Sequence, residues 1–169
     1  MSPRKTVIAI SGTPGTGKTT LAAFLSKALG FSRIDLHEHY KAVATKYDRK
    51  KQCYVVDIRK VAALVRKEKR EASRGIIIDS HISHLLPRRL IDLCIVLTCS
   101  DLKVLEKRLK KRKYSRKKIR ENLDAEIFQV CWLEAQERGQ QVIVFDTAKG
   151  MKKKEILKRI VKEMEGRSR

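Results

Sequence analysis

The stretch "GTPGTGKT", residues 12–19, decides the fold of this chain. It fits the pattern G-x-x-x-x-G-K-[ST], in which glycines allow a tight turn and successive backbone N–H groups point at one oxyanion. The amine of Lys18 can then reach the outer phosphates of a nucleotide, and the hydroxyl of Thr19 can ligate Mg²⁺. A turn rich in glycine and threonine could also match by chance, so the flanking residues decide between these interpretations.

The flanking residues have the patterns of a strand and a helix. The apolar residues of Lys5–Ser11 (TVIAI) predict a buried strand. Leu21, Leu25 and Leu29 recur at helical spacing, and that helix would direct its positive N-terminal end at the same loop. Strand, loop and helix therefore follow one another in the order that a phosphate-binding P-loop requires, and we expect residues 12–20 to hold the phosphates of ATP.

The composition bounds the class of protein. A chain of 169 residues, 42% of them hydrophobic, is most simply one domain with a sizeable core. No apolar run approaches the roughly 18 residues of a membrane span, and we expect no signal peptide because the first residues lead directly into the first strand. The four cysteines form no C-x-x-C pair and have no histidines at zinc spacing; Cys94 and Cys99 are expected in the core. We therefore expect a cytoplasmic protein.

Basic residues are in large excess. Forty Lys and Arg against nineteen Asp and Glu give a net charge of +21, which indicates a polyanionic partner such as RNA, or else a generally basic surface without a specific partner. Aromatic residues make up only 5%, so a stacking platform for single-stranded nucleic acid is not expected. Any RNA contact is therefore expected through backbone phosphates.

The segment Lys103–Arg120 carries eleven Lys and Arg and one acid. Arg108 and Arg112 lie four residues apart, hence on one helix face, and could close over ATP to neutralise charge during phosphoryl transfer. The other cations could face RNA at the same time. A solvated basic face without a role is the remaining interpretation.

The rest of the chain alternates between strand and helix patterns. Further strands are expected at 32–36, 75–79, 91–98 and 141–145. Helices are expected at 37–47, 56–72, 101–113 and 115–138, and a final helix carries an apolar stripe from Ile156 to Met164. Continuous apolar strands alternating with helices predict an α/β fold, with a central parallel five-stranded sheet flanked by helices on both faces.

Ligands of such a sheet lie at the carboxyl ends of its strands, where the strand Gly75–Asp79 delivers an acid. Asp79 could hold Mg²⁺ through its water shell, or it could cap a turn. His81 could orient an attacking water or the phosphoryl acceptor, or it could fix the loop by a backbone hydrogen bond. The other histidines, His37, His39 and His84, are expected in loops or on the surface.

Four stretches follow one another in a specific order and spacing: GTPGTGKTT (12–20), IIIDSH (76–81), RLKKRKYSRKKIREN (108–122) and AEIFQV (125–130). In these stretches the chain resembles the adenylate kinase isoenzyme 6 family, also called coilin-interacting nuclear ATPases in animals, with adenylate kinase members in archaea. The resemblance covers nearly the whole chain. The P-loop alone indicates only an NTPase, whereas the Asp-x-His pair and the N-x-x-A-E-I-F-Q run are specific to this family.

The resemblance implies a single P-loop kinase domain over residues 1–169, with a region that binds the nucleoside monophosphate at about 35–58 and a short lid at about 111–121. It implies a broad nucleoside monophosphate kinase that converts ATP and AMP to two ADP and also hydrolyses ATP. It further implies a role in late maturation of the small ribosomal subunit and its 16S rRNA. The implied transient partners are a platform ribosomal protein (the uS11 family) and the pre-ribosome.

The resemblance also assigns roles by motif position. Asp79 and His81 correspond to the Walker B pair, and Arg112 corresponds to the lid arginine. The residues themselves add the expectation that Thr19 and Asp79 place Mg²⁺ and that Lys18, Arg108 and Arg112 act in phosphoryl transfer. The expected ATP-binding residues are Gly12, Gly15, Thr16, Gly17, Lys18, Thr19, Thr20, Arg112 and, near the adenine, Lys149.

The chain departs from the family pattern in two places. His37-Glu38 replaces an expected Gly-Asp after the second strand, which bears on the choice of monophosphate, and Lys113 stands in the lid where glycine is usual. Two alternatives remain: an ATPase assembly factor whose main role is to bind a ribosomal protein and RNA, and a small-metabolite kinase of similar fold, such as a shikimate or gluconate kinase.

Overall fold

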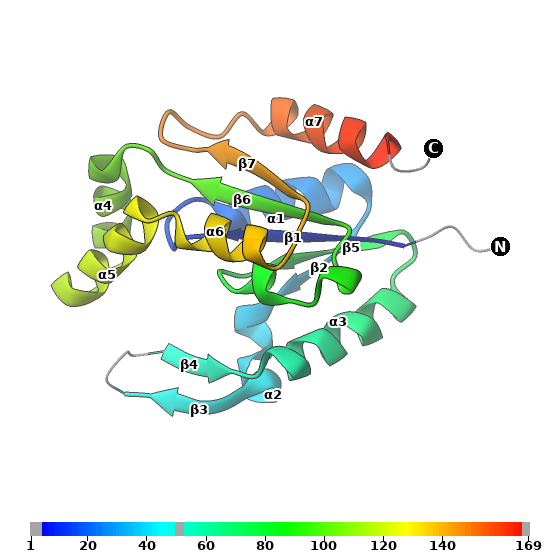
Figure 1. Ribbon diagram of the computed structural model, residues 1–169, viewed down its shortest axis with the longest axis horizontal. Helices are drawn as coiled ribbons and strands as arrows, with labels where there is room; N and C mark the ends of the chain where they lie inside the picture. Colours follow the sequence, from blue (N-terminus) through cyan, green and yellow to red (C-terminus); the bar gives the residue numbers. More distant parts are fainter. Residues whose placement is uncertain (1–4, 50–52, 167–169) are drawn as a thin grey trace.

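The computed structural model describes residues 5–49 and 53–166. Its centre is the expected parallel five-stranded sheet, in the order β2-β5-β1-β6-β7 (Figure 1). The strands are β1 (Thr6–Gly12), β2 (Ser32–Asp35), β5 (Gly75–Asp79), β6 (Leu93–Thr98) and β7 (Val142–Asp146). Strand β1 lies between β5 and β6, so the loop that follows it opens at the middle of the carboxyl edge.

Both faces of the sheet are covered because the strands are apolar on both sides. Ile8 and Ile10 pack in one cluster with α1 (Lys18–Leu29) and α7 (Lys153–Glu165). Val7 and Ala9 pack in the other, with α3 (Ile58–Glu71) and α6 (Val130–Glu137). This is the layered arrangement that continuous apolar strands predict. Cys94 and Cys99 are fully buried, as expected.

The helix expected over 37–47 is wrong. The chain instead forms a 3₁₀ turn (Leu36–His39), one turn of helix α2 (Tyr40–Val43), and an antiparallel hairpin of β3 (Ala44–Asp48) and β4 (Cys53–Val56), whose loop 50–52 lies outside the described residues. Thr45 and Tyr47 favour strand over helix, and the segment has no sustained apolar stripe to hold a longer helix on the core. Helix α3 then starts behind Asp57, whose carboxylate accepts the N–H of Arg59 at 2.8 Å.

The single helix expected over 115–138 is also wrong. It divides into α5 (Arg116–Ile127) and α6, with Gln129 between them at a φ of 49°. The break has a packing reason: Ile119 of α5 packs against α4 (Leu102–Lys111), whereas Ala135 of α6 packs on the sheet. A straight helix could not present both residues to these two clusters.

The hairpin of α4 and α5 carries the segment expected as the lid. Asp101 caps α4 by accepting the N–H of Lys103 at 2.9 Å, and Ser115 caps α5 by accepting that of Lys118 at 3.2 Å. Between the helices Lys113 has a φ of 56°, a left-handed backbone conformation that favours glycine.

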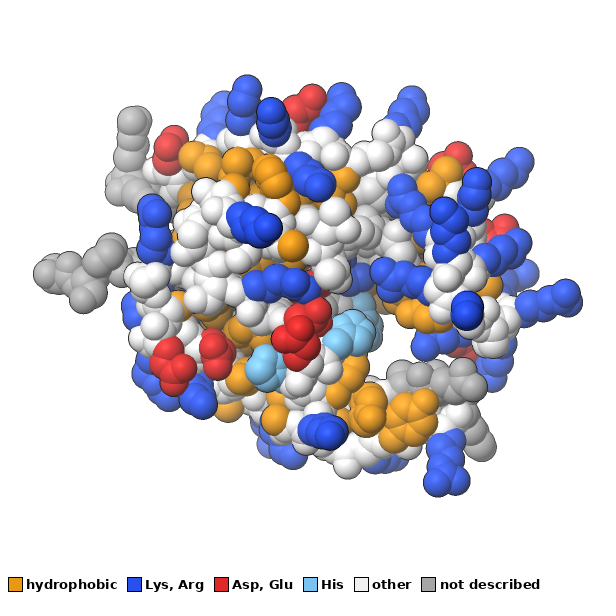
Figure 2. Space-filling view, turned by 180° about the vertical axis from the view of Figure 1, so that it is seen from behind, with side chains coloured by type: hydrophobic (Ala, Val, Ile, Leu, Met, Phe, Trp, Pro, Cys, Tyr) orange, Lys and Arg blue, Asp and Glu red, His pale blue; other side chains and the backbone are white. Residues whose placement is uncertain are grey.

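Two further 3₁₀ turns, Ser83–Leu85 and Arg88–Leu90, connect β5 to β6. Lysine and arginine side chains are spread over the whole face shown in Figure 2, and acidic ones form only small groups. The expected terminal helix is present as α7, although residues 167–169 that follow it, like residues 1–4 before the first strand, lie outside the described residues. Among the helices of the described chain, none combines the length and apolar character that crossing a bilayer requires.

Candidate active site

The loop after β1 has the backbone that its glycines predict. Gly12, Gly15 and Gly17 have φ angles of 137°, 91° and 97°, a region that side chains disfavour. A Cβ at Gly12 would also collide with the carbonyl oxygen of Leu97. Thr16 closes the turn, because its hydroxyl donates to the carbonyl of Thr13 at 2.8 Å. Helix α1 begins at Lys18, directly after Gly17, so its N-terminal N–H groups face the loop.

Lys18 lies back across this loop. Its Nζ donates to the carbonyl oxygens of Gly12 at 2.8 Å and Thr13 at 3.1 Å. Burial lowers the pKa of Lys18 to about 8, and the nearby Asp79 carboxylate opposes that shift. The amine is therefore mostly protonated at neutral pH, with two carbonyl contacts that a phosphate could replace. Thr19 and Thr20, on the first turn of α1, are exposed.

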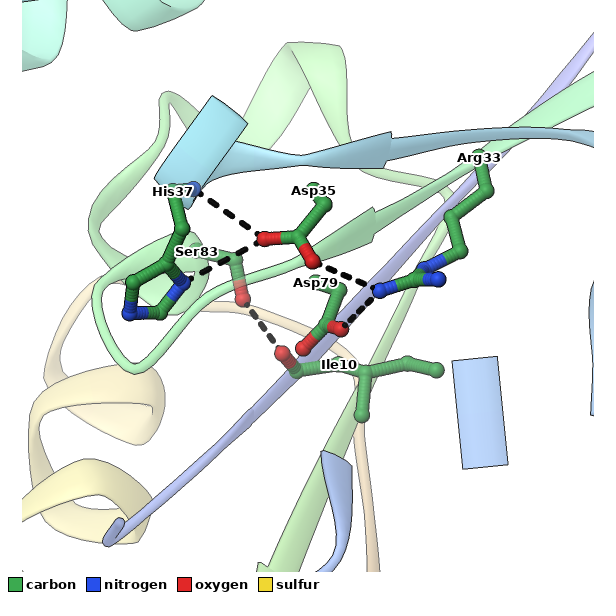
Figure 3. Close-up of polar contacts among 6 residues, drawn as sticks. All are labelled: Ile10, Arg33, Asp35, His37, Asp79 and Ser83. Carbon is green, nitrogen blue, oxygen red and sulfur yellow. Dashed lines mark hydrogen bonds and ion pairs between the residues drawn. The ribbon is translucent and has the colours of Figure 1, made fainter. Parts of the chain in front are cut away.

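Asp79 stands at the carboxyl end of β5, beside the loop, and is only 3% exposed. An arginine that the sequence analysis did not single out contacts it: Nη2 of Arg33 lies 3.0 Å from Oδ2 of Asp79 and 2.8 Å from Oδ2 of Asp35 (Figure 3). Asp35 and Asp79 are paired in neighbouring parallel strands, so Arg33 neutralises two adjacent carboxylates. The alternation of Arg33 and Asp35 along β2 was visible in the sequence, but the neighbour of β2 was not.

The donors at this edge suit Mg²⁺. Asp79 supplies one carboxylate and Thr19 one hydroxyl, and Mg²⁺ is usually held by one or two protein oxygens together with waters and substrate phosphates. Within residues 5–49 and 53–166 there is no group of three or more His, Cys, Asp or Glu that could enclose a metal by itself. The residues present therefore fit an ion that arrives with a nucleotide.

His81 and His84 differ in their surroundings. His81 is exposed; desolvation by the surrounding protein, and then the positive charge of Lys18, lower its pKa, which leaves a neutral imidazole at pH 7. His84 was expected in a loop or on the surface; it lies in the turn Ser83–Leu85 after β5, but it is only 2% exposed, which corrects the surface part of that prediction. Its Nδ1 lies 2.6 Å from the Ser11 hydroxyl and its Nε2 lies 2.8 Å from Glu134. It fixes the loop after β5 to β1 and α6, and Ser83 adds a hydrogen bond to the carbonyl of Ile10 (Figure 3).

A pocket of about 430 Å³ opens on the other side of the loop. Its lining comes from the loop, the end of α4 and the segment after β7: Gly15, Thr16, Gly17, Thr20, Arg108, Lys111, Arg112, Thr147 and Met151. Arg108 and Arg112 thus share one wall, as their spacing predicts. The guanidinium of Arg108 is held by the backbone, donating to the carbonyl of Thr147 at 2.7 Å and that of Gly15 at 3.4 Å. Arg112, at the end of α4, is exposed.

Lys149 occupies a different place. It is exposed and lines a separate pocket with Phe145 and Gly150, whereas Thr147 and Met151 on either side of it line the P-loop pocket. Sequence reasoning also missed Glu126 within the AEIFQV run. This buried side chain accepts the backbone N–H of Cys99 at 2.6 Å and so joins α5 to the end of β6.

Known proteins resemble this chain in sequence and in structure. A family described as an AAA domain matches residues 8–129. The protein named "Adenylate kinase isoenzyme 6 homolog" of Schizosaccharomyces pombe is 40% identical over 141 residues, which cover 82% of this chain and 79% of the relative. The protein of the same name in Dictyostelium discoideum is 39% identical over 141 residues, with the same shares of the two chains.

Among solved structures, shikimate kinase from Acinetobacter baumannii matches with a TM-score of 0.63, over 96% of this chain and 94% of its own, but at 11% identity. At that identity the likeness concerns the fold alone, which is that of the P-loop kinases. The sequence relatives are far closer and match over four fifths of the chain. On the strength of those relatives and of the P-loop, Asp-x-His and AEIFQV motifs, this chain belongs to the adenylate kinase isoenzyme 6 family.

Proposed function

We propose that this protein is a nucleoside monophosphate kinase that transfers the terminal phosphate of Mg²⁺·ATP to AMP or a related monophosphate. One observation carries the proposal: Lys18 and Asp79 flank one point of the sheet edge, and Arg108 and Arg112 line the pocket on the other side of the same loop. Both relatives described above match about four fifths of the chain and are named adenylate kinase isoenzyme 6 homologs, which supports the same reaction class.

In this reaction an oxygen of the monophosphate forms a bond to the γ-phosphorus, and the bond from that phosphorus to the β,γ-bridging oxygen breaks. ATP and AMP become two ADP. The chemistry needs positioning and charge neutralisation rather than a covalent intermediate. The ion would be held by Thr19 and Asp79 and would neutralise charge on the phosphate oxygens.

The protein's own groups provide the rest. The loop N–H groups of Gly15 and Gly17 hold the phosphates, and Lys18 exchanges its two carbonyl contacts for phosphate oxygens. Arg112, exposed at the end of α4, approaches the transferring group when the lid at 111–121 closes. Arg108 stays on the backbone of Thr147 and positions the loop and the nucleotide. Residues 35–58 form the acceptor side.

The second candidate is an ATP-driven assembly factor in the cytoplasm, and the charge of +21 favours it. Here water replaces the monophosphate as acceptor, and neutral His81 helps to place it. The partners would be a ribosomal protein of the uS11 family and the pre-ribosome during 16S rRNA maturation. The basic residues of Lys103–Arg120 would contact RNA phosphates.

ATP turnover with and without excess AMP distinguishes the candidates, if ADP is resolved from free phosphate. Two ADP per ATP, with AMP accelerating ATP loss, support the kinase. Free phosphate that tracks ATP loss, with no effect of AMP, supports the assembly factor.

The variant Lys18→Ala tests the loop itself. It should lower both activities by at least about a hundredfold, because the lysine contacts charge that moves in the transition state. Lys27→Ala, an exposed lysine at the far end of α1, is the matched control and should retain activity. If Lys18→Ala kept full turnover, the P-loop would have no role in either phosphoryl transfer or ATP hydrolysis.

A further inference from the structure

Aromatic side chains that are scattered in the sequence come together at the hairpin of β3 and β4. The chain has only four tyrosines, and three of them, with one histidine, form a continuous series of ring contacts. Ring centroids lie 4.9 Å apart for His37 and Tyr40, 5.1 Å for Tyr40 and Tyr54, and 5.0 Å for Tyr54 and Tyr47. We call these four rings the aromatic ladder.

Three of the four rings of the aromatic ladder are open to solvent, whereas the fourth, Tyr40, is partly buried against the core. Tyr47 is 50% exposed, Tyr54 is 45% exposed, and the side chain of His37 is 66% exposed. Tyr47 and Tyr54 are direct cross-strand partners, and such a pair stabilises a two-stranded hairpin. That role accounts for two of the rings, and packing against the core accounts for Tyr40, but neither explains why the series continues to the exposed ring of His37.

Exposed cations lie on the same segment of the chain as the aromatic ladder. Lys41, Lys46 and Arg49 are exposed along the same segment. In Figure 2 the hydrophobic side chains of the hairpin and the basic side chains of α4 and α5 lie on opposite sides of one hollow. At its inner end the aromatic ladder reaches the proposed active site, because His37 contacts Asp35 at 3.3 Å and Asp35 shares Arg33 with Asp79.

We propose that the aromatic ladder is a stacking surface for the bases of a single-stranded polynucleotide whose phosphates contact the exposed cations of this segment. Rings in series next to cations match the alternation of π-faces and charges along an unpaired strand. A duplex keeps its base faces inside its own stack. A free mononucleotide has one base for four rings, and an acidic peptide satisfies the cations but offers no base to the rings.

The low aromatic content of the chain predicted no stacking platform for single-stranded nucleic acid, and the aromatic ladder reverses that expectation. RNA would then contact the protein through its bases as well as through its phosphates. The proposal does not rest on phosphoryl transfer, because binding is measured on the full chain without ATP. A failed kinase assay would therefore not contradict the stacking surface, and a failed RNA-binding assay would not contradict the kinase activity.

The test measures fluorescence anisotropy of a labelled, unstructured RNA of about ten nucleotides. The variant Tyr47→Val/Tyr54→Val removes two rings while keeping residues that favour strands. Tyr47→Phe/Tyr54→Phe keeps the rings, and Phe128→Leu, on another exposed aromatic outside the hairpin, is the matched control. Trp132, the only tryptophan, reports by fluorescence that each variant is folded.

The double valine variant should bind roughly tenfold or more weakly, since stacking contributes substantially per base. The salt dependence should keep its slope, because no phosphate contact is lost; Lys46→Ala should instead reduce the slope by roughly 0.7. The phenylalanine variant and Phe128→Leu should bind like the original chain.

Three results would overturn the proposal. The first is unchanged affinity of the folded valine variant. The second is that polyglutamate, or a duplex of the same length, competes as well as the unlabelled RNA does. Electrostatic attraction alone would then explain the binding. The third is displacement of the RNA by AMP at concentrations near its KM, which would assign the rings to the acceptor nucleotide.

Discussion

Nη2 of Arg33 lies 3.0 Å from Oδ2 of Asp79, and the same nitrogen contacts Asp35 at 2.8 Å. The arginine therefore occupies one oxygen of the carboxylate that we expect to place Mg²⁺. An ion that binds Asp79 through its water shell must displace this contact or share the carboxylate with it.

Replacing Arg33 should change the Mg²⁺ requirement. Arg33→Met frees the Asp79 carboxylate, so ADP binding should need roughly three- to fivefold less Mg²⁺, the equivalent of about 1 kcal/mol for a partly exposed ion pair. Calorimetric titration of ADP at a series of Mg²⁺ concentrations measures this shift. Arg33→Lys keeps the cation and serves as the control; an unchanged or higher requirement in Arg33→Met would show that the pair does not compete with the ion.

Nucleotide affinity should fall as the pH rises above about 8. The pKa of Lys18 is lowered to about 8 by burial, and phosphates bound to the amine would raise it. Above pH 8 the Lys18 amine of the free protein has lost its proton, so nucleotide binding must be coupled to the uptake of one proton. The affinity therefore falls by as much as about tenfold per pH unit. Calorimetry in two buffers of different ionisation enthalpy detects the proton.

The matched variant for this pH dependence is Lys18→Arg. Its guanidinium stays charged throughout, so its affinity should be flat from about pH 8 to 9.5. A decline as steep as that of the original chain would assign the titration to another group.

The glycines of the chain should differ in their tolerance of alanine. Gly12→Ala combines a φ of 137° with a collision between the new Cβ and the carbonyl oxygen of Leu97, and should destabilise the fold by roughly 3 kcal/mol or more. Gly139→Ala has a φ of 66° but nothing within 4 Å, and should cost about 1 kcal/mol. Denaturant unfolding measures both free energies; equal losses would mean that the collision relaxes without cost.

His84 should make stability depend on pH below 6.5. Burial lowers its pKa and outweighs the opposing Glu134, so the unfolded chain binds the proton more readily. The free energy of unfolding therefore falls as the pH drops from 6.5 towards the folded-state pKa, and this contribution is fully present only above 6.5. His84→Gln should be less stable at pH 7 by about 1–3 kcal/mol, because it removes the contacts of the buried ring with Ser11 and Glu134.

The same variant should lose less stability than the original chain between about pH 6.5 and 5, because it lacks the titrating ring. Parallel pH profiles of the two proteins would contradict this account. Carboxylates that do not contact residue 84 have the same surroundings in both proteins and cancel in the comparison.

Local patterns determined the main architecture. The P-loop pattern specifies its own turn, because glycines at fixed positions permit φ angles that other residues avoid. Continuous apolar strands require cover on both faces, so the parallel sheet and its flanking helices followed from the sequence. The shared wall of Arg108 and Arg112 followed from their spacing on one helix.

Other features depended on segments distant in the chain. The hairpin of β3 and β4 was missed because its alternation carries lysine and tyrosine rather than a clear apolar face. The break at Gln129 was missed because its two helices pack against different clusters, which local periodicity does not record.

The sequence by itself determined a P-loop kinase fold, the phosphate-binding loop and the basic character of the chain. Only the tertiary structure brought Arg33 to Asp79, buried His84 between Ser11 and Glu134, and gathered three tyrosines on one hairpin. The physical reason is range: a turn or an amphipathic helix is specified by residues a few positions apart. A side-chain contact between neighbouring strands depends on the order in which the whole sheet assembles.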